Sequence, residues 1–213
     1  MIKAVIFDMD GVLIDAKEWH YEALNRALAL FGFEISRYDH LTAYDGLPTK
    51  KKLEMLSLEK KLPRELHPFI NRMKQSYTME IVHSKCKPRF TQEYALSTLK
   101  SKGYVLAVAS NSIRDTVEVM MAKARLDIYL DTMFSSADVS HPKPNPEIYL
   151  KAMARFNLVA TECLVVEDND NGIRAALDSG AHVLVVKRVE DVNFENIASR
   201  IRDLEMNQNR ECA

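Results

Sequence analysis

The chain has 213 residues, of which 28% are charged and 47% are hydrophobic, and its formal net charge is -1. This composition is ordinary for a globular protein, and it lacks the basic excess that nucleic-acid-binding proteins usually carry. No apolar run approaches the roughly 20 residues that a membrane-spanning helix needs, and Asp8 and Asp10 interrupt the first run too early for a signal peptide.

The cysteines are few and odd in number, and Cys86, Cys163 and Cys212 lack the spacing of a metal site. Such a set is more typical of a reducing compartment than of a disulfide scaffold. We therefore expect a cytoplasmic protein. Our default expectation for the oligomeric state is a monomer, and the composition suggests neither nucleic acid nor membrane as a partner.

The first predicted strand, Ala4–Phe7, is followed by about seventy residues without a convincing strand. Three stretches there have helical patterns: Glu18–Phe31, Pro48–Leu56 and Arg64–Val82. We interpret residues 16–85 as an all-helical insertion, a cap domain, within a core domain formed by residues 1–15 and 86–213.

From about Pro88 onward, strand and helix patterns alternate. The apolar segments are Tyr104–Ala109, Cys163–Val166 and His182–Val186, and a further strand is placed at Phe134–Val139. The helical segments are Gln92–Ser101, Ile113–Ala124, Pro146–Phe156 and Gly172–Ser179. The best-defined apolar segments are hydrophobic on both faces, as in a parallel sheet covered by helices. The sequence therefore predicts an α/β fold, a Rossmann-like doubly wound parallel sheet.

Polar residues follow the predicted strands, where ligands bind in such sheets. They are Asp8 and Asp10, then Ser110 and Asn111, then Lys143, and finally Glu167 and Asp168. If the strands are parallel, these residues gather at one edge of the sheet. Clustered carboxylates repel one another and need a cation, and oxygen ligands together with a phosphate favour Mg²⁺.

This set suits phosphoryl transfer. Asp8 would attack phosphorus and form an aspartyl phosphate, and Asp10 would serve as acid and base. Gly11 would let the chain turn close to the phosphate, while Lys143 and Ser110 would bind phosphoryl oxygens.

Each motif taken alone also has a purely structural interpretation. The Asp8 and Asp10 pair could form a strand-end turn that caps a helix, and Ser110–Ser112 could cap a helix starting at Ile113. Lys143 could be a solvated lysine, and Glu167 and Asp168 a charge pair in a loop. We expect Asp170 and Asn171 to cap the helix that follows them.

Four motifs in this order resemble those of the haloacid dehalogenase superfamily: Asp8-Met9-Asp10-Gly11-Val12, Ser110-Asn111, Lys143-Pro144 and Glu167-Asp168. The longer forms around Lys143 and Glu167 are similar to β-phosphoglucomutase and its phosphatase relatives. The resemblance implies a helical cap between the first two motifs. It implies that Asp8 attacks and binds Mg²⁺, and that Asp10 is the acid and base and offers its carbonyl to the metal.

The same resemblance implies that Ser110, the Asn111 backbone and Lys143 bind the phosphoryl group. Asp168 would be a metal ligand, and Glu167 a direct or water-mediated one. Many relatives carry serine where this chain has Asn169, so a modest change in the hydrogen bonds around the metal is expected.

In the cap, three residues are candidates for substrate binding. His20 matches a histidine that often lies near the substrate in the family, although it could equally be a surface residue of its helix. Lys50 could attract an anionic substrate or simply be solvated. Thr49 occupies the position at which mutase-like members carry arginine, which weakens a mutase interpretation without removing it.

We expect a Mg²⁺-dependent phosphatase, a phosphoric monoester hydrolase, acting on a small phosphorylated metabolite such as a sugar phosphate. The alternative is a phosphosugar mutase like β-phosphoglucomutase. Dehalogenases and phosphonate hydrolases lack the second aspartate, so Asp10 argues against both. A signalling receiver domain would carry its acidic pair on the first strand and its phosphoacceptor on a middle one, and a non-catalytic binding protein would not need the complete set.

Overall fold

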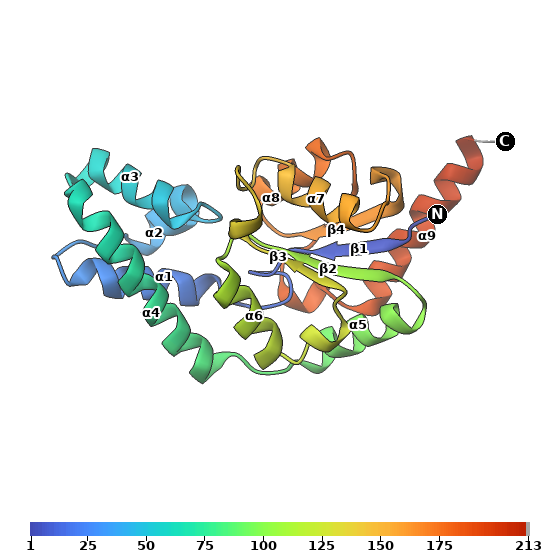
Figure 1. The fold of residues 1–213 in the computed structure, drawn as a ribbon, viewed down its shortest axis with the longest axis horizontal. Helices are drawn as coiled ribbons and strands as arrows, with labels where there is room; N and C mark the ends of the chain where they lie inside the picture. Colours follow the sequence, from blue (N-terminus) through green and yellow to red (C-terminus); the bar gives the residue numbers. More distant parts are fainter. Residues whose placement is uncertain (212–213) are drawn as a thin grey trace. The chain divides into compact units, whose positions relative to one another are not determined.

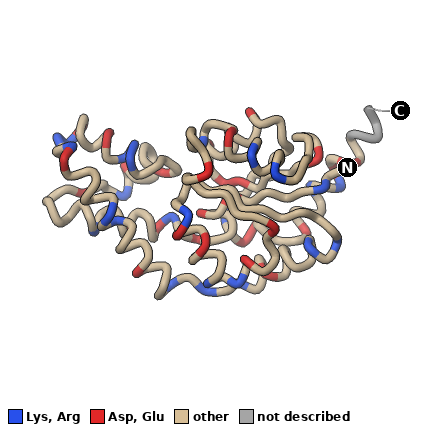
Figure 2. The backbone as a smooth tube through the Cα atoms, in the orientation of Figure 1, with Lys and Arg blue, Asp and Glu red and all other residues tan. Residues whose placement is uncertain are grey.

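The computed structural model describes residues 1–211, with side chains described up to Asn207, and it forms two compact units (Figure 1). The core unit contains Met1–Asp15 and the chain from Lys87 onward, and the helical unit contains Ala16–Cys86. Figure 2 shows Lys and Arg interspersed with Asp and Glu along both units, in line with the nearly neutral net charge. No helix in the described part of the chain is long and apolar enough to span a membrane.

The core unit contains a five-stranded parallel sheet with the order β3-β2-β1-β4-β5. Its strands are β1 (Ala4–Phe7), β2 (Val105–Ala109), β3 (Thr132–Phe134), β4 (Cys163–Glu167) and β5 (His182–Val185). In the central register, Ile6 pairs with Ala107 on one side and with Val165 on the other. The predicted fold class is confirmed.

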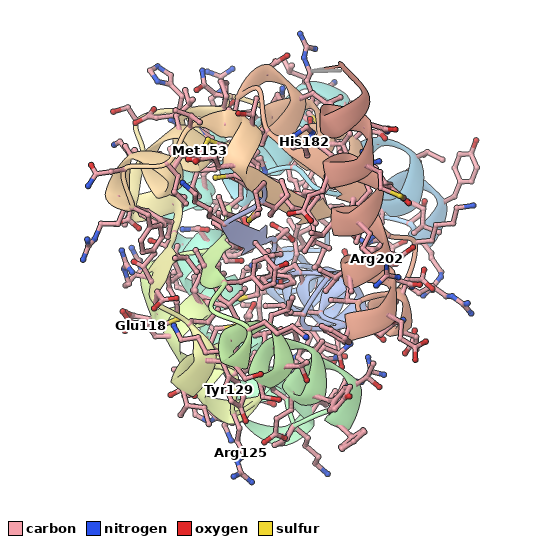
Figure 3. All side chains as sticks on the ribbon, turned by 90° about the vertical axis from the view of Figure 1, so that its right-hand side faces the viewer. Glu118, Arg125, Tyr129, Met153, His182 and Arg202 are labelled. Atoms are coloured by element: carbon pink, nitrogen blue, oxygen red, sulfur yellow. The ribbon has the colours of Figure 1, made fainter. Side chains whose placement is uncertain are left out.

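Helices cover both faces of the sheet, and this explains why the central strands are apolar throughout. They are α5 (Phe90–Ser101), α6 (Arg114–Lys123), α7 (Glu147–Arg155), α8 (Asp170–Asp178) and α9 (Phe194–Glu211). Ala4 and Ile6 pack in one cluster with residues of α7 and α8, so the alternating Val5 and Phe7 face the opposite layer. Figure 3 shows Met153 of α7 and Glu118 of α6 on opposite sides of the sheet.

The prediction of a strand at Phe134–Val139 is wrong: the strand ends at Phe134, and Ser136–Asp138 forms a 3₁₀ turn. The Ser135 hydroxyl accepts a hydrogen bond from the Ala137 amide at 3.2 Å, and the Asp138 carboxylate accepts one from the Ser135 amide at 2.7 Å. Arg114 also binds Asp138. These local hydrogen bonds replace the sheet ladder that a strand at this place would have formed.

The helical unit consists of α1 (Lys17–Ala29), α2 (Arg37–Asp39), α3 (Thr49–Lys60) and α4 (His67–Lys85), with a π turn at His40–Tyr44 and a 3₁₀ turn at Arg64–Leu66. Further 3₁₀ turns, at Asp127–Tyr129, Ala160–Glu162 and Val189–Asp191, lie in the core unit. The helical unit has a hydrophobic core of its own, formed by Leu24, Ala27, Leu28, Ile35, Tyr44, Leu53, Leu56, Leu62 and Ile70.

One polar clamp holds the chain that leaves α1. The Asn25 side chain donates a hydrogen bond to the Ile35 carbonyl and accepts one from the Ile35 amide, both at 2.8 Å. Ile35 is buried in the core of the helical unit, so its backbone has little access to water as an alternative partner.

We expect Asn25→Ala to lower the free energy of unfolding of the helical unit by about 1–3 kcal/mol, because it leaves the buried Ile35 amide unpaired. The Ile35 carbonyl would keep only its hydrogen bond from the Tyr21 hydroxyl, at 3.1 Å. Trp19, the single tryptophan of the chain, lies on α1, so its fluorescence during urea denaturation reports on this unit. The control is Asn71→Ala, at an exposed position on α4. Equal midpoints for the two variants would contradict the role given to the clamp.

Candidate active site

Asp8 lies at the point where the strand order reverses, because the chain places β2 and β4 on opposite sides of β1. Its amide still donates to the Val166 carbonyl at 3.0 Å, which extends the ladder by one residue. The chain then turns sharply: Gly11 has a φ of 93°, and its amide donates to the Ile14 carbonyl at 2.7 Å. Only glycine adopts such a φ easily, so Gly11 allows the turn that follows Asp8.

The Lys143 ammonium is the centre of the site. Its Nζ donates to Asp8 Oδ1 at 2.6 Å, to the Ala109 carbonyl at 2.7 Å and to Glu167 Oε1 at 2.7 Å. Lys143 is 3% exposed, Asp8 5% and Glu167 0%, so these contacts are shielded from water. A buried lysine with three acceptors joins the ends of β1, β2 and β4.

A buried tyrosine also contacts this centre. Tyr149, on α7 and fully buried, donates its hydroxyl hydrogen to the same Glu167 Oε1 at 2.7 Å. The Lys143 ammonium lies 4.7 Å from the centroid of its ring, a cation–π distance. The other carboxylate oxygen, Glu167 Oε2, accepts the Asp168 amide at 3.0 Å.

Burial and neighbouring charges shift the pKa values of these groups. Burial raises the pKa of Asp8 well above its usual range, Lys143 acts against this rise, and the Glu167 carboxylate adds to it. Burial lowers the pKa of Lys143, but Asp8 and Glu167 outweigh it and the net shift is upward. Burial and Glu167 likewise raise the pKa of the Tyr149 hydroxyl. The lysine is therefore charged, and the carboxylates around it repel one another.

Three carboxylates are close enough to share a metal ion. Asp8, Glu167 and Asp168 each offer an oxygen, and these oxygens lie within 4.8 Å of one another. A set made only of oxygen ligands fits a hard divalent cation such as Mg²⁺. The excess of negative charge around the single lysine also favours binding of a cation.

The structure contradicts the interpretation of the loop after β2 as a helix cap. Ser110 does not cap α6, whose first residue follows Ile113; instead its buried hydroxyl accepts the Ser112 amide at 3.1 Å. The Asn111 side chain pairs with the Lys143 backbone, accepting its amide at 3.0 Å and donating to its carbonyl at 3.3 Å. The capping prediction fails because these side chains bind within and between the loops.

Asp10 is held by Ser112, which the sequence suggested only as part of a helix cap. The Ser112 hydroxyl donates to Asp10 Oδ2 at 2.9 Å. The Ser112 backbone is itself fixed, since its amide binds Ser110 and its carbonyl accepts the Ser136 amide at 2.9 Å. One oxygen of the Asp10 carboxylate is thus oriented by the loop after β2.

The loop after β4 begins α8 with Asn169 as its cap. The Asn169 side chain accepts the Gly172 amide at 3.1 Å, so the prediction that Asp170 and Asn171 cap this helix is wrong. The reason is position: Asp170 is already the first helical residue. The residue that forms this cap, Asn169, is the one for which the resemblance implied a change from serine.

The candidate residues of the cap lie in the helical unit. His20, on α1, has its Nδ1 3.3 Å from the Nζ of Lys74 on α4. Thr49 is the first residue of α3, and Lys50, next to it, is exposed. Their role toward a substrate stays a prediction.

Within the core unit, the structure brings Asp8, Lys143, Glu167 and Asp168 into one cluster and ties Asp10 to the loop of Ser110 and Asn111. Sequence reasoning missed the parts played by Tyr149, Ser112 and Gly172. Tyr149 lies within the longer motif around Lys143, but the sequence assigned it no role of its own.

Comparison with known proteins identifies the family. Residues 5–186 match the model of the haloacid dehalogenase-like hydrolases. The chain belongs to this family. It is 30% identical, over 84% of its own length and 82% of the relative, to the phosphorylated carbohydrates phosphatase of Thermotoga maritima. It is 29% identical, over the same shares of both chains, to the phosphoglycolate phosphatase of Aquifex aeolicus.

Solved structures of this family have the same fold. The β-phosphoglucomutase of Clostridium difficile superimposes with a TM-score of 0.82 at 21% identity, over 97% of this chain and 100% of the other. CbbY of Rhodobacter sphaeroides, solved with phosphate, gives a TM-score of 0.76 at 25% identity, over 87% and 86%. The predicted resemblance is confirmed. The relatives named as phosphatases also confirm the predicted enzyme class, a phosphoric monoester hydrolase of the haloacid dehalogenase type.

Gly172 leaves the space that the Glu167 carboxylate occupies. A Cβ at position 172 would overlap with that carboxylate, which cannot move away without breaking its bonds to Lys143 and Tyr149. Glycine is thus required here although it lies inside a helix, where alanine is ordinarily about 1 kcal/mol better.

We expect Gly172→Ala to lower the free energy of unfolding by roughly 1–3 kcal/mol, because the added methyl overpacks a fixed group. In a Glu167→Ala background the same change should be neutral or stabilising, because the overlapping atoms are gone. Urea denaturation of the four chains of this double-mutant cycle measures the coupling. Equal effects in both backgrounds would refute the overlap with Glu167.

Proposed function

We propose that this protein is a Mg²⁺-dependent phosphatase that hydrolyses a small phosphorylated metabolite through an aspartyl phosphate on Asp8. The observation that carries the proposal is the pairing of Asp8 with the buried Lys143 at the switch point of the sheet. A carboxylate beside a fixed cation, at the edge where ligands of such sheets bind, is suited to receive a phosphoryl group.

The metal would be held by Asp8, Glu167 and Asp168, with the Asp10 carbonyl as a further ligand implied by the family. When bound, the cation would offset the charge of these carboxylates and of the phosphoryl oxygens. Glu167 would bind the metal directly or through water. Both of its oxygens already accept hydrogen bonds within the protein.

In the first half-reaction, an Asp8 oxygen attacks phosphorus and the bond between phosphorus and the ester oxygen breaks. Asp10 gives its proton to the departing oxygen, and the Ser112 hydroxyl orients the Asp10 carboxylate for this transfer. Lys143 and Ser110 hold phosphoryl oxygens as charge builds up. In the second half-reaction, Asp10 takes a proton from water, the water oxygen attacks phosphorus, and Asp8 and inorganic phosphate are released.

The substrate class follows from the relatives and from the helical unit. The two relatives reported above are named for phosphorylated carbohydrates and for phosphoglycolate, both small phosphate esters. The helical unit would act as a cap, and His20, Thr49 and Lys50 are its candidate residues for recognising the part of the substrate beyond the phosphate. Closure of such a cap excludes bulk water while the phosphoryl group is transferred.

Phosphate release from a panel of phosphorylated sugars and short-chain acids, with Mg²⁺ and after chelation, tests the proposal. We expect release only with the metal, and we expect Asp8→Asn to reduce it at least about a thousandfold because the amide is not a nucleophile. The control is Asp178→Asn, the same change at an exposed position on α8, which should retain wild-type rates.

Two outcomes would contradict the proposal. Appreciable turnover by Asp8→Asn would exclude Asp8 as the nucleophile. If no ester released phosphate while β-glucose 1-phosphate was isomerised in the presence of a bisphosphate primer, the chain would be a phosphosugar mutase instead.

A further inference from the structure

All three protons of the Lys143 ammonium are already donated, to Asp8, to the Ala109 carbonyl and to Glu167. A phosphoryl oxygen that accepts a hydrogen bond from this ammonium must therefore displace one of these acceptors, since the group has three donors and no more. The acceptor that is displaced should be the one whose lost hydrogen bond costs the least free energy.

Glu167 would ordinarily be the most costly to give up. Its carboxylate is fully buried, and a buried charge left without its partner is strongly destabilising. The Ala109 carbonyl belongs to β2 and is fixed by the sheet. Asp8 must stay beside the phosphoryl group, because in the proposed mechanism it is the nucleophile.

Tyr149 changes this balance. Its hydroxyl donates to Glu167 Oε1, the same oxygen that Lys143 binds, while the Asp168 amide donates to Oε2. Both carboxylate oxygens therefore keep a donor when Lys143 turns away. The tyrosine ring lies under the ammonium, so the cation remains close to it during the exchange.

The tyrosine is held in place for this role. It is fully buried on α7 and packs in the same cluster as Ala109, Cys163 and Ala176, residues of the sheet and of α8. With its ring packed on these neighbours, the hydroxyl cannot swing to another acceptor.

We propose that Tyr149 is a positioning residue that allows Lys143 to leave Glu167 and bind the phosphoryl group. The inference rests on the proposed function, in which Lys143 contacts a phosphoryl oxygen. Without the tyrosine hydroxyl, Glu167 Oε1 depends on Lys143 alone, and the ammonium stays with the carboxylate instead of the ligand.

The first test is binding of inorganic phosphate by calorimetry, in the presence of Mg²⁺, to the wild type and to Tyr149→Phe, which keeps the ring. We expect about tenfold weaker binding by the variant and a similar rise in KM, which is the size of one lost hydrogen bond to a charged group. The control is Tyr104→Phe, which removes a half-buried hydroxyl at the opposite end of β2. A lower melting temperature with unchanged phosphate affinity and KM would overturn the inference.

The second test repeats the comparison in a Glu167→Gln background. The neutral amide holds the ammonium more weakly, so Tyr149→Phe should change phosphate affinity less than twofold there. This double variant also keeps the test decisive if Tyr149→Phe alone does not fold, because the neutral amide at position 167 leaves no buried negative charge there without a donor. A tenfold effect in both backgrounds would show that the tyrosine does not act through Glu167.

Lys143→Met separates this inference from the proposed function. If that variant loses phosphate binding while Tyr149→Phe keeps it, the inference is overturned and the proposed function stands. If Lys143→Met binds phosphate as well as the wild type does, both are overturned.

Discussion

The buried Lys143 ammonium is the interaction on which the site depends. It joins acceptors from the ends of three strands, Asp8 after β1, Ala109 in β2 and Glu167 in β4. A lysine suits these three acceptors, since a point charge on a flexible stem can reach all of them without the fixed planar geometry of an arginine. The geometry of the site therefore depends on the packing of the sheet edge, and a change in the packing would move the residues of the site.

The parallel sheet and the position of Asp8 could be predicted because the signals are strong and local. Ala4–Phe7 and Cys163–Glu167 are apolar on both faces, which in an α/β protein leaves few alternatives. β3 could not be placed, because its three residues, Thr132–Phe134, are too few to show a period. The turn after it depends on Arg114, twenty-four residues away along the chain from Asp138.

The sequence predicted which residue types form the site, but not which side chains bind one another there. Sequence reasoning grouped Lys143 with the carboxylates, since each follows a predicted strand. It did not find Tyr149 or Ser112, because a tyrosine on an amphipathic helix and a serine before one are ordinary residues until the fold brings them against Glu167 and Asp10. Gly172 was equally hidden, because the space it leaves is defined by a side chain from another element.

The pairing of the Asn111 side chain with the Lys143 backbone joins two loops that are 32 residues apart in the sequence. The two loops therefore act as one structural unit, because the Asn111 side chain fixes the position of the Lys143 backbone. In a set of related sequences, this position should covary with the composition of the lysine loop and not with the substrate. For protein engineers, transplanting either loop alone into another scaffold would bring the residues of the site without the geometry that aligns them.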